Sequence, residues 1–76
     1  MDDKTLTILI TEAYTQHTMS KGVLRIGQCI WNTFDDYFKT ECPEKNDKFQ
    51  QLRGSNIDPF YVDSKIDAFL EEVAKI

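Results

Sequence analysis

The sequence predicts an all-α protein, a small antiparallel helical bundle of three main helices plus one short helix. Three segments place apolar residues three and four positions apart, which is the spacing of one helix face. Turn-forming residues separate these segments, notably Gly22, Pro43 and Gly54. A chain of 76 residues is too short for more than one core, so we expect a single helical domain spanning 1–76.

The first helix is expected from about Lys4 to His17. Its apolar stripe consists of Leu6, Leu9, Ile10, Ala13, Tyr14 and His17. Asp3 is the predicted N-cap, because its carboxylate would lie near the free amides of the first turn. The β-branched residues between Leu6 and Thr11 favour a strand locally. The stripe continues beyond them, and we therefore prefer the helix.

After a connection at 18–22, the second helix is expected to begin near Leu24–Gly27 and to end near Thr40. Its stripe consists of Ile26, Ile30, Phe34, Tyr37 and Phe38, widened by Cys29 and Trp31. A glycine in the first turn costs up to about 1 kcal/mol relative to alanine. We therefore expect Gly27 to mark the close approach of another backbone, either the first helix or the Asp58-Pro59 segment.

A short third helix is predicted from Pro43 to about Leu52. Pro43 suits the first helical position, Phe49 and Leu52 would be buried, and Gly54 would follow the helix end. Asp58 before Pro59 then predicts a capped single turn through Tyr61.

The last helix is expected to start at Asp63 or Ser64, with Asp63 acting as an N-cap. Ser64 and Asp67 have the spacing of a capping box. The apolar stripe of this helix is Ile66, Phe69, Leu70, Val73 and Ile76. Glu71 and Glu72 would face solvent.

The charge of the chain bears on its partners. The formal net charge is −4, and the nine basic residues are scattered from Lys4 to Lys75. Binding to phosphates needs a concentrated Lys/Arg surface, so we expect no nucleic-acid partner. The longest apolar-rich stretch, Leu6 to Ile10, is too short to span a bilayer, so no membrane is expected either. The polar N-terminus does not resemble a secretory signal, and a cytoplasmic location is the default.

The residues capable of chemistry do not form a recognisable catalytic or metal pattern. Cys29 and Cys42 do not form a C-x-x-C pair, and the single histidine, His17, cannot complete a zinc site with them. The sequence has no phosphate-binding or metalloprotease motif. We therefore expect no cofactor and no metal, and we do not expect an enzyme. Catalysis would require His17 and a cysteine to meet in one cleft.

Two stretches are more specific than generic helix sequence. One is R-I-G-Q-C-I-W-N at 25–32, and the other is L-R-G-S-N-I-D-P-F-Y at 52–61. Together they resemble a pattern of small uncharacterised bacterial and phage proteins, in which an R-x-G-Q-x-[IVL]-[WF]-N helix start precedes an L-R-G-[ST]-x-[LI]-D-P-F-Y segment. The resemblance covers the chain from about Leu24 onward. It implies a phage or mobile-element setting and implies no activity.

These two motifs supply the candidate site. Its residues are Gln28, Trp31, Asn32, Arg53, Asp58 and Tyr61. In one interpretation they form a structural latch, in which Gln28 and Asn32 bond the backbone of the Asp58–Tyr61 loop. In the other, Trp31, Arg53 and Tyr61 form a protein-binding patch, because such residue types are enriched at interface hot spots.

The function favoured by the sequence is that of a small accessory or regulatory protein that binds another protein. The reasons are the absence of catalytic motifs, the absence of a basic surface, and a high content of aromatic residues. A structural homo-oligomer, most simply a homodimer, is one alternative. Another is an acidic inhibitor or immunity-type protein that caps a basic partner surface. That alternative predicts that Asp35, Asp36, Glu71 and Glu72 gather on one face.

Overall fold

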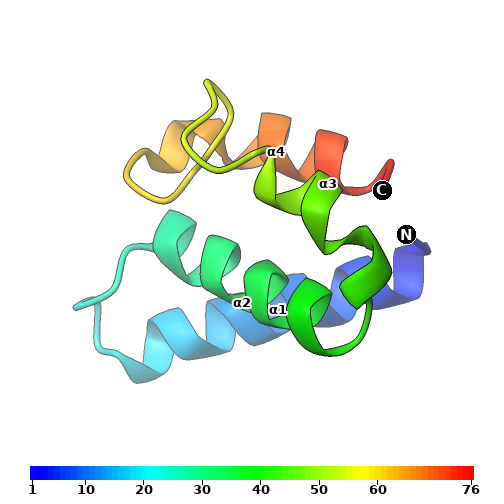
Figure 1. Ribbon diagram of the computed structural model, residues 1–76. Helices are drawn as coiled ribbons and strands as arrows, with labels where there is room; N and C mark the ends of the chain where they lie inside the picture. The colour runs from blue at the N-terminus through cyan, green and yellow to red at the C-terminus, as the bar shows by residue number, and fades with distance from the viewer.

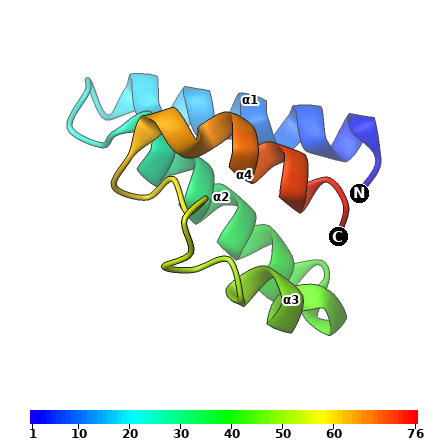
Figure 2. The same cartoon turned by 90° about the horizontal axis from the view of Figure 1, so that it is seen from above.

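The computed structural model describes residues 1–76 and has the predicted all-α fold. Its four helices are α1 (Asp3–Met19), α2 (Ile26–Thr40), α3 (Asn46–Gln50) and α4 (Ile66–Val73). Helix α2 lies in the middle, with α1 on one side and with α3 and α4 on the other (Figure 1). Helix α4 runs antiparallel to α1, and the two chain ends lie near each other (Figure 2). None of the helices combines the length and the apolar character needed to cross a membrane.

Helix α1 starts one residue earlier and ends two residues later than the periodicity predicts. Asp2, and not Asp3, is the N-cap, and its carboxylate accepts a hydrogen bond from the Thr5 amide at 2.7 Å. Hydrogen bonding to the side chain of Thr5, and then to its backbone amide, keeps the pKa of Asp2 below its usual value, because both favour the ionised carboxylate. The β-branched residues between Leu6 and Thr11 are helical despite their local preference for a strand. Within the helix, the hydroxyl of Thr11 donates to the carbonyl of Thr7 at 2.8 Å.

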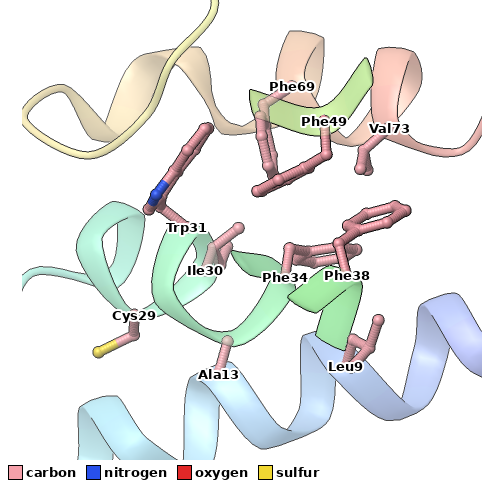
Figure 3. Packing of buried hydrophobic residues seen from close by; sticks show 10 residues of the cluster. All are labelled: Leu9, Ala13, Cys29, Ile30, Trp31, Phe34, Phe38, Phe49, Phe69 and Val73. Carbon is pink, nitrogen blue, oxygen red and sulfur yellow. The ribbon is translucent and has the colours of Figure 1, made fainter. Parts of the chain in front are cut away.

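Helix α2 supplies most of the core. Its side toward α3 and α4 carries three large aromatic residues, Trp31, Phe34 and Phe38, which are all buried (Figure 3). Phe49 of α3 stacks between Trp31 and Phe38, with ring centroids 4.7 Å from each. Phe69 of α4 meets Phe34 edge-on at 5.7 Å. Such pairs add to the hydrophobic stabilisation that the buried area already supplies.

The opposite side of α2 packs on α1. Cys29 is fully buried on this side, and α1 contributes Leu9 and Ala13 to the same cluster (Figure 3). Ala13 is small and completely covered, which allows the two helix backbones to approach closely. The prediction that Cys29 is a small core residue is therefore confirmed.

Gly27 confirms the predicted close approach and identifies the partner segment. A Cβ atom at this position would collide with the carbonyl oxygen of Pro59 and would lie 2.8 Å from a carboxylate oxygen of Asp63. The Gly27 amide donates to the same Asp63 carboxylate at 2.9 Å. The segment before α4 therefore sits directly on the first turn of α2, and only glycine leaves room for it.

The predicted third helix is interrupted. Pro43–Lys45 forms a 3₁₀ turn, and α3 itself has only five residues, ending at Gln50 rather than Leu52. Phe49 is buried as predicted, whereas Leu52, which was also expected to be buried, is only half-buried. Gly54 adopts a left-handed conformation with φ of 73° after the helix end. A helix this short is held mainly by the packing of its one aromatic anchor, Phe49.

The predicted capping of the last helix is wrong. A 3₁₀ turn at Asp63–Lys65 precedes α4, and no side chain caps either element. Ser64 and Asp67 do not form a capping box, and Asp63 caps α2 instead of its own helix. The predicted turn at Asp58 is confirmed: the Asp58 carboxylate accepts from the Phe60 amide at 2.9 Å.

Candidate functional site

Four of the six predicted site residues meet around one small hollow. Its volume is about 120 Å³, and its lining consists of Trp31, Arg53, Asp58, Phe60 and Tyr61. The side chain of Trp31 is only 1 % exposed, so it belongs to the core and not to a binding surface. The predicted patch of Trp31, Arg53 and Tyr61 therefore lacks its central residue.

Arg53 is held in place by contacts within the molecule. Its guanidinium lies 5.1 Å from the ring centroid of Trp31 and 3.7 Å from the carboxylate of Asp35. Its Nε also donates to the side chain of Gln50 at 3.1 Å. These contacts fasten the segment after α3 onto α2, which is an architectural role for Arg53.

The Asp58–Tyr61 loop is also bound internally. One carboxylate oxygen of Asp58 accepts from Gly54 at 2.7 Å, while the other accepts from Phe60. Tyr61 is 77 % exposed, and the guanidinium of Arg25 lies 5.5 Å from its ring centroid. Tyr61 is thus the single lining residue of this hollow with a large, freely accessible ring.

A latch between this loop and α2 exists, but other residues make it. Arg25 donates to the carbonyl of Phe60 at 2.9 Å, and the Gly27 amide donates to Asp63. Gln28 and Asn32 contribute no hydrogen bond to the loop, and Asn32 is exposed to solvent. The sequence motifs thus indicated the correct contact between segments but the wrong side chains. Arg25 begins the first motif and Asp63 lies two residues beyond the second, and neither was among the candidate residues.

The histidine and the two cysteines do not share a cleft. His17 Nδ1 lies 2.7 Å from the carbonyl oxygen of Leu24, where it fastens the connection after α1. Burial raises the pKa of the Cys29 thiol, and the charge of Asp63 adds to the effect, so the unreactive protonated form is favoured. Cys42 lies near Tyr37, with its sulfur 3.3 Å from the phenol oxygen. None of the three hollows in the surface is lined by His17 or by a cysteine.

The outward side of α1 is unusually poor in charge. A shallow, open hollow of about 410 Å³ is lined by Ile10, Thr11, Tyr14, Thr15, Thr18 and Met19, which we call the α1 outer face. Tyr14 is 51 % exposed and Met19 is 77 % exposed. The hydroxyl of Thr15 donates to the Thr11 carbonyl at 2.9 Å, so its hydrogen remains bonded when water is excluded. Solvent-facing helix sides ordinarily carry charged residues, and none of the six residues of the α1 outer face is charged.

A second hollow lies between α1 and α2. We call it the α1–α2 groove; its volume is about 290 Å³, and it is lined by Thr5, Ile8, Leu9, Glu12, Thr33, Asp36, Tyr37, Thr40 and Glu41. A hydrogen bond with Cys42, together with burial, raises the pKa of Tyr37 to about 12, and the negative charges of Asp2 and Glu41 contribute. The sequence contained a signal for neither hollow beyond the regular spacing of threonines along α1.

The four acidic residues expected on one face do not gather there. Asp35 pairs with Lys39 at 2.9 Å and with Arg53, whereas Asp36 lines the α1–α2 groove. Neighbouring residues on a helix point in different directions, which separates this pair. Glu71 and Glu72 belong to α4, on the other side of α2 (Figure 1).

Comparisons with protein-family models, with curated proteins and with solved structures found no match for this chain.

Proposed function

We propose that this is a small accessory protein that acts, without catalysis, by binding another protein through the α1 outer face. The observation that carries the proposal is the absence of charged side chains among the six residues of the α1 outer face. Tyr14 and Met19 are exposed there, among threonines whose hydroxyls are bonded to the helix backbone. Exposed apolar surface of this kind is typical of interaction sites.

The positions of the large exposed apolar residues also favour α1 as the binding element. Of the six large hydrophobic residues that are exposed, four lie on α1 or in the turn that follows it: Ile8, Tyr14, Met19 and Val23. The aromatic residues of α2, α3 and α4, by contrast, are mostly enclosed in the core. The large exposed apolar side chains are therefore concentrated on α1 and in the turn that follows it. The phage or mobile-element setting remains an expectation drawn from the resemblance alone.

The test compares three forms of the protein as bait in a lysate of the source organism. The double variant Tyr14→Ala/Met19→Ala should lose a protein that the wild type retains, since truncating a central hot-spot residue typically costs 2 kcal/mol or more, about thirtyfold in affinity. The matched control is Tyr61→Ala, which truncates an even more exposed ring elsewhere. Retention that depends on Tyr61 and not on Tyr14 contradicts the proposal.

A homodimer is the alternative use of the same face, because an uncharged helix side can pair with a copy of itself without charge repulsion. Light scattering at high protein concentration separates the two possibilities. A dimer that the Tyr14→Ala/Met19→Ala variant dissociates would assign the α1 outer face to self-association. A monomer that retains no protein partner at micromolar concentration would overturn both.

A further inference from the structure

We propose that the α1–α2 groove binds a lysine or arginine side chain of the partner protein. This inference rests on the proposed function, since it names the chemistry of the partner that α1 would bind. Two independent observations carry it: the charges that line the groove and a buried hydroxyl without a hydrogen-bond partner.

The charges in the groove are all of one sign. Glu12, Asp36 and Glu41 line it, and no lysine or arginine does. None of the three carboxylates forms an ion pair, although Asp35, on the neighbouring side of α2, pairs with both Lys39 and Arg53. Like charges repel one another, and a cation placed among them would lower the electrostatic energy. The groove is thus complementary to a positive group that the chain itself does not supply.

Thr33 provides the second observation. It lines the groove and is only 6 % exposed, yet its hydroxyl oxygen is buried without any hydrogen-bond partner. The hydroxyls of Thr11, Thr15 and Thr40 behave differently, because each donates to a carbonyl four residues earlier in its helix. A buried polar group without a partner is destabilising. This oxygen is covered in the free protein, so the groove wall must shift before an N–H group of a bound cation supplies the donor that it lacks.

The rest of the lining favours a side-chain cation over a metal ion. The acidic residues do not form a group of the kind that holds a metal ion. Ile8 and Leu9 add apolar surface to the groove. Lysine and arginine combine an apolar stem with a charged head, and such side chains bury the stem while the head meets the carboxylates. Because α1 carries both Ile8 and the α1 outer face, one partner can contact both surfaces.

The experiment titrates the isotope-labelled protein with N-acetyl-lysine amide and with N-acetyl-arginine amide, and follows the backbone amide resonances. We expect saturable shifts at Thr33, Asp36 and Glu41 with at least one cation, and the tighter ligand identifies the preferred side chain. N-acetyl-norleucine amide, which has a similar stem and no charge, should cause none of these shifts. Absence of saturable shifts with both cations, or equal shifts with norleucine, overturns the inference.

Charge variants separate the groove from the general negative charge of the chain. Asp36→Asn should weaken binding about threefold, as expected for loss of one exposed ion pair. Glu71→Gln removes the same charge from α4 and should leave the affinity unchanged. If the two variants weaken binding equally, the attraction is diffuse and the groove is not a site.

Thr33→Val separates a binding role from a structural one. Valine keeps the shape and removes the hydroxyl, so the melting temperature should rise while cation binding becomes weaker. A higher melting temperature with unchanged binding would show that the hydroxyl does not contact the ligand, and the inference would fail. The outcome does not depend on Tyr14 or Met19, so failure of the groove and failure of the α1 outer face are distinguishable.

Discussion

At the scale of the residue, the backbone of α2 meets the carbonyl oxygen of Pro59 at Gly27, where no side chain fits. The usual preference of helices for alanine over glycine is reversed at this position, because steric exclusion outweighs the gain in helix propensity. The same contact brings the Asp63 carboxylate within hydrogen-bond distance of the Gly27 amide. One missing Cβ thus allows two separate interactions between segments far apart in sequence.

The substitution Gly27→Ala tests this account, because helix propensity and steric exclusion predict changes of opposite sign in the free energy of unfolding. Helix propensity alone would stabilise the variant by up to about 1 kcal/mol. We expect instead a loss of about 1–3 kcal/mol in the free energy of unfolding, as is usual for overpacking, because the methyl group must displace Pro59. Urea denaturation followed by circular dichroism gives the value.

Gln28→Ala is the matched control for that measurement. It introduces the same alanine one residue further along α2 with a smaller gain in helix propensity, where the native side chain is half-buried and makes no hydrogen bond to the loop. Its stability should stay within about 0.5 kcal/mol of the wild type. A stable Gly27→Ala protein would show that the loop can withdraw from α2 without cost.

At the scale of the element, the helices are predictable from sequence and their ends are less so. The apolar stripes of α1, α2 and α4 follow the helical period, and that local signal is sufficient to place them. The caps are different, because α2 begins without a capping side chain of its own and receives one from Asp63. A capping carboxylate 36 residues away leaves no trace in the local pattern. Ser64, by contrast, satisfies the local rule for a cap and makes no cap bond.

Replacing Asp63 should therefore destabilise α2 and not α4. Loss of an N-cap typically costs about 1 kcal/mol, so Asp63→Ala should lower the free energy of unfolding by about that amount. Hydrogen exchange should accelerate at Gly27 and in the following turn. Ser64→Ala, the control, should have almost no effect. If Ser64→Ala is the more harmful change, the capping box operates and the role assigned to Asp63 is wrong.

At the scale of the whole molecule, the core and the surface differ in how far the sequence reveals them. Phe34, Phe38, Phe49 and Phe69 were expected in the core, and they are buried there. Trp31, for which the sequence left a structural role and a binding patch open, is buried with them. The α1 outer face and the α1–α2 groove were not foreseen. They depend on which side of α1 remains uncovered after packing, and periodicity does not specify how two stripes are oriented against each other.

The burial of Cys29 provides a way to measure how often α1 separates from α2. Cys29 is fully buried between α1 and α2, and burial raises the pKa of its thiol. A disulfide reagent can therefore reach the sulfur only when α1 separates from α2. In a Cys42→Ser background, the labelling rate of Cys29 divided by that of a cysteine in an unfolded peptide should equal the fraction of molecules in the open form. Rapid labelling in buffer would mean that α1, the longest helix, separates from α2 frequently.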